Sequence, residues 1–377
     1  MNILFKYRII QMNFTVFLRR NSNIKRYKGD IKVEYIREIN IREAVIHILD
    51  NNSEEPILNE FALDLNEENY NFLLKHIQRC LKDEGLKYAR FNKEKSIVKD
   101  LSQEYLNGEN NILDVSKELA RQMFILMRAK GNIPSCDILT VSFSTEYGMF
   151  LSIFKMDYIK NYLHNIQYVD NKIGIDIVPQ FTGLPASSSR IQKCAFIKVL
   201  CQSNEYDLMV IDKKLKNKSA EDYGSNWFSQ SYLGCTLIDN ERDETRDFIK
   251  LTEKWTQNAL SENADKQEQV RRKVKETLRQ EEVIDIEKFA DETFPKNPEI
   301  KESFKEYAAE YGIKEKVNID KDYVDKKLKR VRLKIDRDID LYISEDAYKD
   351  NNRFEIQRNG DGSINMILKY ISNYIEK

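Results

Sequence analysis

The sequence has little glycine and proline, few cysteines and histidines, and almost no net charge. Its 377 residues include 12 Gly, 6 Pro, 5 Cys and 3 His, and 61 Lys and Arg oppose 62 Asp and Glu. So little Gly and Pro excludes collagen-like and low-complexity chains. An odd number of cysteines without short spacing motifs indicates reduced thiols rather than a disulfide framework, as is typical of a cytoplasmic protein.

Long apolar segments are missing as well. No run approaches the roughly 20 residues that a membrane helix requires, and the opening segment is interrupted by Lys6, Arg8 and Gln11. We therefore expect neither a membrane helix nor a signal peptide. Hydrophobic residues make up 41% of the chain, including 20 Tyr and 18 Phe, which excludes global disorder. A chain of this length can bury its core without a disulfide or a metal.

The common catalytic motifs are absent. The chain has no G-x-S-x-G, no G-x-x-x-x-G-K-[ST] and no G-x-G-x-x-G, and His47, His76 and His164 are isolated from one another. No two cysteines have the spacing of a structural zinc site. We therefore expect no cofactor, no metal and no enzymatic activity.

One pattern keeps an enzymatic alternative open. Asp176 lies on one predicted strand, and Asp212-Lys213-Lys214 closes a later one. Metal-dependent nucleases place carboxylates on neighbouring strands to hold Mg²⁺, with a lysine against the attacked phosphate. The pattern is short, and a chain with this many charged residues produces it by chance.

Hydrophobic periodicity predicts an α+β fold, with a mixed, mostly antiparallel sheet and packed helices, then a helical segment and a small C-terminal β unit. Short connections between the central strands favour antiparallel pairing. Predicted strands cover 12–19, 30–37, 137–143, 147–155, 172–180, 194–200 and 206–212. Predicted helices cover 70–81, 112–127, 248–259, 270–278 and 304–311.

The C-terminal region returns to a period of two. Residues 330–343 alternate apolar and charged side chains except at Arg337, which predicts one long strand with a bend or bulge. A hairpin is predicted around Asn359–Gly362. These patterns suggest four parts: an N-terminal extension with a strand pair (1–36), an α+β core domain (37–240), a helical segment (241–315) and a C-terminal β unit (316–377).

Positive charge is concentrated locally despite the overall balance. Residues 326–337 hold seven cations and one anion, and residues 266–279 hold six cations and two anions. Helical spacing places Arg271, Lys275 and Arg279 in one row beside the apolar stripe, and strand spacing places Arg330, Arg332 and Lys334 in another. Lys213 and Lys214 add a smaller cluster. Such rows suit phosphate contact without reading sequence, but the same cations can instead pair with the abundant acids.

Several segments occur in an order that resembles a known family. They include INIREAVIHILDNN (39–52), YGMFLSIFKMDY (147–158), WFSQSYLGC (227–235), VRRKVKETLRQEEVIDIEKFADETFP (270–295) and VRLKIDRDIDLYI (331–343). Over about residues 37–370 the chain resembles the bacterial nucleoid-associated protein family of the NdpA type. The resemblance implies a cytoplasmic protein found with the nucleoid and associated with DNA, and it implies no catalytic residues. Residues 1–36 have no counterpart in it.

The sequence thus favours a non-enzymatic protein that binds double-stranded DNA with low specificity through phosphate contacts. Two alternatives stay open: a Mg²⁺-dependent nuclease or phage-defence DNA-processing protein, and a scaffold that other proteins recruit to the nucleoid. A homodimer is also left open, because the aromatic run Trp227, Phe228 and Tyr232 fits either a core or a dimer contact.

Overall fold

A computed structural model describes residues 33–94, 96–170, 172–184, 191–213, 226–336, 338–373 and 375. Its centre is a seven-stranded sheet with the strand order β1-β3-β4-β7-β8-β2-β9, in which every neighbouring pair is antiparallel. The strands are β1 (Asn40–Leu49), β2 (Lys87–Phe91), β3 (Cys136–Thr145), β4 (Gly148–Asp157), β7 (Lys193–Lys198), β8 (Leu208–Asp212) and β9 (Cys235–Ile238).

Both faces of this sheet are covered, and each has its own hydrophobic core. Helix α2 (Glu67–Leu81) packs Leu73 and Ile77 on one face. Helices α3 (Ile97–Leu106) and α4 (Ile112–Lys130) cover the other, together with the π-helical turn η1 (Phe228–Leu233). Because of this double coverage, β3 is buried on both faces from Cys136 to Phe143, its polar residues included.

A second region follows the sheet. Trp255, Phe289 and Phe304 lie at the centre of its hydrophobic core. Its elements are α5 (Glu241–Ala259), α6 (Ala264–Gln280), β10 (Val283–Asp285), α7 (Ile286–Thr293), α8 (Pro298–Glu310), β11 (Lys316–Asn318) and α9 (Lys321–Leu328). The boundary at residue 315 stays a prediction, although Val317 and Val324 beyond it pack into this core.

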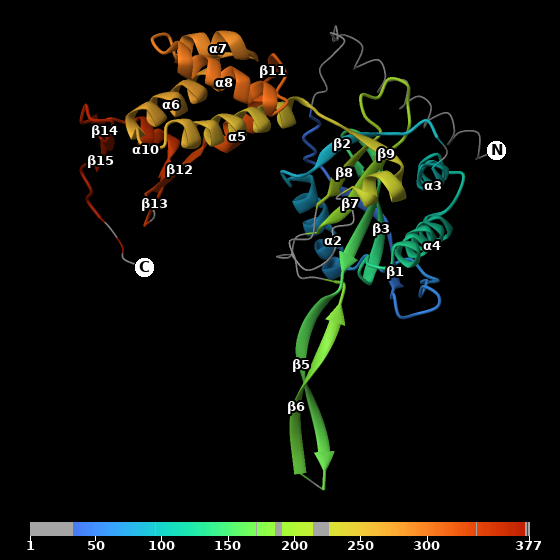
Figure 1. Ribbon diagram of the computed structural model, residues 1–377. Coiled ribbons are helices and arrows are strands. Elements are labelled where there is room, and N and C mark those ends of the chain that lie inside the picture. Colours follow the sequence, from blue (N-terminus) through green and yellow to red (C-terminus); the bar gives the residue numbers. More distant parts are fainter. Residues whose placement is uncertain are drawn as a thin grey trace, which may run out of the picture.

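Two hairpins end the described chain. They are formed by β12 (Arg330–Ile335) with β13 (Ile339–Ser344), and by β14 (Phe354–Arg358) with β15 (Ile364–Leu368); the short helix α10 (Glu345–Lys349) connects them. A further ribbon, β5 (Ile159–Val169) with β6 (Lys172–Thr182), extends away from the sheet (Figure 1).

The predicted α+β class is confirmed, and so are the hairpin of β3 with β4 and the C-terminal hairpin of β14 with β15. The helix predicted at 112–127 is α4, which continues to Lys130 and is capped by Gly131, whose φ of 71° lies in the left-handed region that glycine adopts without strain. Phe228 and Tyr232 are buried in the sheet's core, in agreement with one of the two interpretations of the aromatic run.

Two predicted strands need comment. The strand predicted at 30–37 is wrong in its described part, because residues 33–39 form no strand. The backbone N–H groups of Val33 and Glu34 donate instead to the side chains of Glu241 and Tyr88. The strand predicted at 12–19 lies outside the described residues.

The single strand predicted at 330–343 is also wrong. The structure has two strands, paired from Arg330 opposite Ser344 to Ile335 opposite Ile339, and Asp336 has a φ of 48° where the chain turns. Ile335 and Ile339, the last and first residues of the two strands, are separated by an even number of positions. The apolar residues therefore stay at odd positions on both sides of the turn, and the alternation of apolar and charged residues could not reveal it. The one break in this alternation, at position 337, lies between the two strands.

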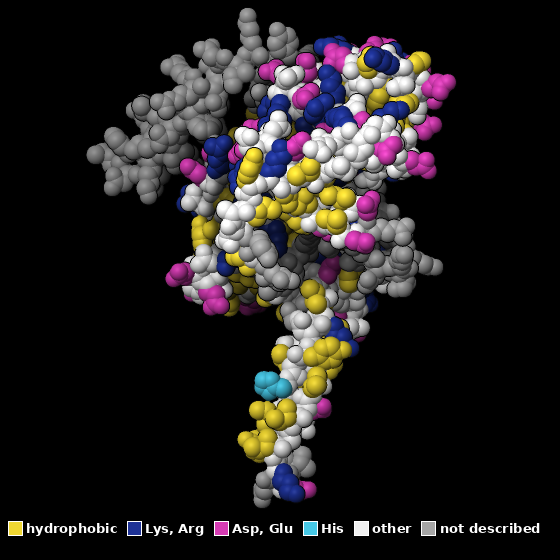
Figure 2. Space-filling view, turned by 90° about the vertical axis from the view of Figure 1, so that its left-hand side faces the viewer, with side chains coloured by type: hydrophobic (Ala, Val, Ile, Leu, Met, Phe, Trp, Pro, Cys, Tyr) yellow, Lys and Arg dark blue, Asp and Glu magenta, His cyan; other side chains and the backbone are white. Residues whose placement is uncertain are grey.

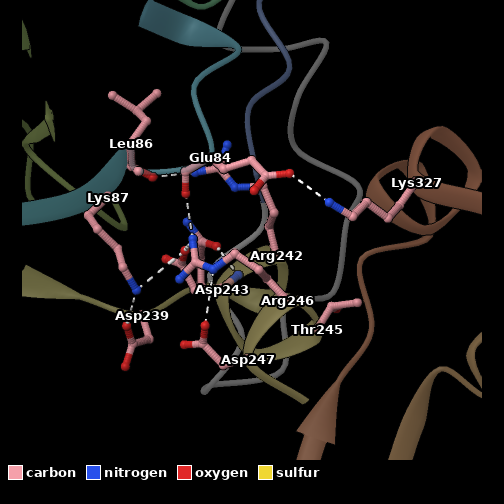
Figure 3. A network of polar contacts seen from close by, with 12 residues as sticks. Glu84, Leu86, Lys87, Asp239, Arg242, Asp243, Thr245, Arg246, Asp247 and Lys327 are labelled. Carbon is pink, nitrogen blue, oxygen red and sulfur yellow. Dashed lines mark hydrogen bonds and ion pairs between the residues drawn. The ribbon is translucent and has the colours of Figure 1, made fainter. Parts of the chain in front are cut away.

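A buried polar network joins the beginning of α5 to the loop before β2 (Figure 3). The side chain of Asp243 is fully buried and lies 2.8 Å from Arg246 and 3.4 Å from Lys87. Arg246 also donates to the carbonyl of Glu84 over 2.6 Å, and Arg242 donates to the carbonyl of Leu86. The first turns of α5 are therefore fixed to the sheet region.

Replacing Asp243 with Asn should lower the free energy of unfolding by roughly 3–5 kcal/mol, because it leaves buried cations without their carboxylate. Urea unfolding followed by circular dichroism measures the change. Asp247→Asn is the matched control: among the described residues its carboxylate pairs with Arg246 alone, and it is 38% exposed, so a loss of less than about 1 kcal/mol is expected. Equal losses in the two variants would contradict a special role for the buried carboxylate.

His47 supplies a pH-dependent contribution to stability. It is 1% exposed; its Nδ1 accepts the N–H of Asn59 at 3.0 Å, so its Nε2 is the protonated nitrogen facing the Ser116 hydroxyl at 2.9 Å. Burial, followed by the nearby Lys117 and Arg121, lowers the pKa of His47 from 6.5 to about 4. The folded protein therefore binds this proton less tightly than the unfolded chain does.

Stability from His47 is present above pH 6.5 and is lost as the pH falls toward 4. Linkage gives a loss of about 2 kcal/mol between pH 7 and pH 5. Urea unfolding of the His47→Gln variant should show a pH dependence smaller by about that amount. A wild-type pH dependence in His47→Gln would refute this account.

Candidate nucleic-acid interface

A cavity of about 590 Å³ lies between α6 and the C-terminal β unit. Its floor is apolar and includes Leu328, Val331 and Phe354. Its rim carries more positive than negative charge: the cations are Arg272, Lys275, Arg279, Lys349 and Arg358, and the anions are Glu268, Glu276 and Glu345. The cavity thus combines an apolar base with an excess of two positive charges.

Helix α6 forms one wall of the cavity because it has an apolar face and a neighbouring basic face. Val270, Val274 and Leu278 are buried in the helical core. Lys275 and Arg279 lie one residue further on, about 100° around the helix, and this rotation turns them toward the C-terminal β unit. The N–H groups at the start of α6 are capped by the side chain of Asn263, and the last carbonyls accept from Lys321.

The cations of the row on α6 are not free. Arg271 forms two hydrogen bonds, of 2.8 and 2.9 Å, with the carboxylate of Glu253 on α5, and it does not line the cavity. Arg279 is paired with Glu345 on α10. The helix is packed on both sides of its apolar stripe, so the neighbouring row faces protein instead of open solvent.

Lys275 has an aromatic neighbour. Its ammonium lies 4.5 Å from the ring centroid of Tyr348, close enough for a cation–π interaction. Burial, and then the adjacent positive charge of Arg279, lowers the pKa of Lys275. The ammonium group is therefore partly desolvated and close to another cation, so an anion bound in the cavity would stabilise its charged form.

The row on β12 is placed as predicted. Arg330, Arg332 and Lys334 are exposed on one face of the hairpin, while Val331 between them is buried and lines the cavity. Strand β12 therefore separates the cavity from the exposed row. Across the hairpin the row faces Ser344, Tyr342 and Asp340.

Within this row only Arg332 has an ion pair among the described residues. Its guanidinium lies 3.3 Å from Asp340 and 5.0 Å from the ring centroid of Tyr342. The ring is itself 64% exposed. Cations beside an exposed aromatic ring match what a nucleic acid offers, namely phosphates and the faces of bases.

Of the two remaining predicted cations, only Lys213 is described. It forms an ion pair with Asp83 in the loop after α2. It lies on none of the elements that form the cavity or the exposed row. Lys214 lies outside the described residues.

The predicted nuclease arrangement does not assemble. Asp176 lies on β6, whose partner is β5, whereas Asp212 ends β8, whose partners are β7 and β2. Asp212 is also already occupied: its carboxylate pairs with Lys193 and accepts the N–H and hydroxyl of Ser229 at 2.8 and 2.9 Å. In the described residues no three His, Cys, Asp or Glu side chains gather as metal ligands.

A family model described as Nucleoid-associated protein YejK matches residues 45–376. The chain belongs to this family. The match covers most of the sheet, the ribbon of β5 and β6, the helical region and both basic surfaces. No curated protein matches the chain. None of the helices described is long and apolar enough to cross a membrane.

Sequence reasoning missed half of the cavity. Arg272 lies inside a recognised charge cluster, but Lys349, Arg358 and Tyr348 belong to none. They meet α6 only because the chain returns to it about seventy residues later. The one available signal was the hairpin predicted around Asn359–Gly362, since Arg358 is the residue that precedes this turn.

Glu345 neutralises Arg279 and Lys349 within the cavity, so Glu345→Gln should strengthen phosphate binding there. We expect severalfold tighter binding of a duplex oligonucleotide in fluorescence anisotropy, and a salt dependence steeper by up to about one unit. Glu253→Gln is the matched control, because it frees Arg271 outside the cavity. Equal effects of the two variants, or none, would contradict a role for the cavity.

Proposed function

We propose that the chain binds double-stranded DNA in the nucleoid without enzymatic activity and without reading base sequence. The observation that carries this proposal is the exposed row Arg330, Arg332 and Lys334 on one face of β12. Membership of a nucleoid-associated family supports the same conclusion. The affinity would come from neutralised phosphates and released counterions.

The geometry of the hairpin suits a backbone contact. Alternate strand residues are roughly 6.6–6.8 Å apart, a regular spacing that lets neighbouring cations meet neighbouring phosphates. The hairpin has a polarity as well, because Arg330 lies at its base, whereas Lys334 lies opposite Asp340, and Asp336 and Asp338 lie at the turn. A duplex would therefore cross nearer the base of the hairpin than its turn.

The cavity is proposed as a second, smaller contact for the same ligand. Lys275 and Arg279 line it, and its carboxylates limit its net charge. Arg271, Lys213 and Lys214 rank below these residues, because Arg271 and Lys213 already have carboxylate partners and Lys214 lies outside the described residues. The two surfaces lie on opposite faces of β12, so their contributions should be nearly additive.

Binding should weaken steeply with salt and change little between unrelated duplexes. Neutralisation of about six phosphates predicts a slope near −5 for log K against log salt concentration. Replacing Arg330, Arg332 and Lys334 with Ala should flatten this slope by about two to three units, about one for each lost contact and less for Arg332, which already pairs with Asp340. Anisotropy titrations with two unrelated duplexes and a single strand measure both quantities.

The matched control removes three exposed cations from the sheet region: Lys75, Lys93 and Arg121. Its slope should stay close to that of the wild type, although the overall charge changes equally. A wild-type slope in the β12 variant would refute the assignment of the row. Cleavage of plasmid DNA with Mg²⁺, lost in Asp212→Ala, would favour the nuclease instead. Failure to bind naked DNA even at low salt would favour a recruited scaffold.

A further inference from the structure

The ribbon of β5 and β6 exposes an unusual amount of apolar surface. Each strand has 11 residues, and the ribbon's only strand pairing in the described chain is between these two strands. Figure 2 shows hydrophobic side chains along its length, with a histidine among them. An isolated two-stranded hairpin in water is marginally stable at best, so this ribbon needs a partner surface.

The pairing register sorts the side chains onto two different faces. Opposed residues share a face, so Ile166 lies beside Ile175 and Tyr168 beside Ile173. We define the apolar face by its large hydrophobic members: Tyr162, Ile166, Tyr168, Ile173, Ile175, Ile177 and Phe181. The opposite face is mostly polar, and Asn165 there lies beside Asp176.

The apolar face is large enough for a stable interface. Its seven hydrophobic side chains are between 52% and 75% exposed. With an area on the order of 150 Å² for each side chain, the lower end of the range for aromatic residues, they present on the order of 700 Å². A standard protein interface buries about 800 Å² on each partner, and monomers rarely expose contiguous apolar patches of this size.

The charges of the ribbon do not fit nucleic acid. Its described ionised residues are Lys160 and Lys172 against Asp170 and Asp176, so the cations and anions balance. A strand pair that binds DNA or RNA needs an excess of positive charge. The occupant of the apolar face is therefore expected to be apolar itself.

We propose that two copies of this chain dimerise by packing their apolar faces together, with the two ribbons antiparallel. A two-fold axis places the apolar face of one copy against the same face of the second copy. Two-fold symmetry is also the commonest symmetry of protein dimers. The axis would pass near the midpoint of the ribbon, where His164 lies opposite Ile177. The sheet regions would then lie at opposite ends of the paired ribbons.

The charges at the two ends of the ribbon select the antiparallel arrangement. Lys160 lies near the base, with its ammonium 5.2 Å from the ring centroid of Tyr162, so it borders the apolar face. Asp170 lies at the tip, about ten residues or roughly 33 Å away. Antiparallel ribbons bring Lys160 of each copy to the partner's Asp170, whereas parallel ribbons would oppose two lysines.

Sedimentation equilibrium of the full chain tests the dimer. The wild type should be dimeric at micromolar concentration, and Ile175→Glu should weaken dimerisation at least tenfold, because it places two carboxylates in the interface. Gln167→Glu adds the same charge to the polar face and should dimerise like the wild type. Circular dichroism checks that each variant is folded.

Three outcomes would overturn the dimer. A monomeric wild type at tens of micromolar, or equal effects of Ile175→Glu and Gln167→Glu, would do so. A monomeric wild type whose duplex binding is lost in Ile175→Glu would assign the ribbon to nucleic acid instead. Because the row on β12 is unchanged in Ile175→Glu, each monomer should otherwise keep its own contacts with DNA.

Charge reversal tests the arrangement. Lys160→Glu and Asp170→Lys should each weaken dimerisation severalfold, since each places like charges at both ends of the paired ribbons. The double variant exchanges the two charges and should restore wild-type dimerisation. Failure of the double variant to recover would exclude the antiparallel arrangement.

Discussion

The buried carboxylate of Asp243 is the contact on which the arrangement of the molecule depends. It is fully buried between Lys87 of the sheet region and Arg246 of its own helix. A buried carboxylate is costly unless cations compensate it. Arg246 also donates to the carbonyl of Glu84, and the neighbouring Arg242 donates to that of Leu86, both in the loop before β2. One charge thereby fixes the first turns of α5. Helix α5 in turn packs against α6, which forms a wall of the basic cavity.

Charge and apolar surface are segregated between different parts of the molecule. The described ribbon of β5 and β6 has balanced charge and an uncovered apolar face, whereas the hairpin of β12 and β13 has an exposed row of cations. A nearly neutral chain can therefore offer one surface to a polyanion and another to an apolar partner. Net charge alone would have revealed neither surface, because acids elsewhere cancel the local excess.

The parts of the fold that the sequence predicted are those whose signal is local. Helix α4 has a complete apolar stripe and a terminal glycine, and β3 with β4 has a clear turn between two buried runs. Strand β5 was missed because it is exposed on both faces and lacks a strict alternation. The row on α6 was misjudged because its partners, Glu253 and Glu345, are distant in sequence. The residue pattern of one helix cannot show that a carboxylate from another element lies beside it.

The partners of a cation decide how much it can contribute to DNA binding. Residues 326–337 contain seven cations, but Lys327 pairs with Glu84, Arg332 pairs with Asp340, and Lys326 lies over the ring of Tyr35. No described carboxylate pairs with Lys329, Arg330 or Lys334. A phosphate gains most from a cation whose charge is not already compensated, because replacing an existing carboxylate returns little free energy. The affinity should therefore depend mainly on the described cations without a carboxylate partner, Lys329, Arg330 and Lys334, and less on Lys327 and Arg332. Dimerisation through the ribbon would double the number of such cations in one assembly. Two linked weak contacts with DNA would then bind more tightly than the contact of either copy alone.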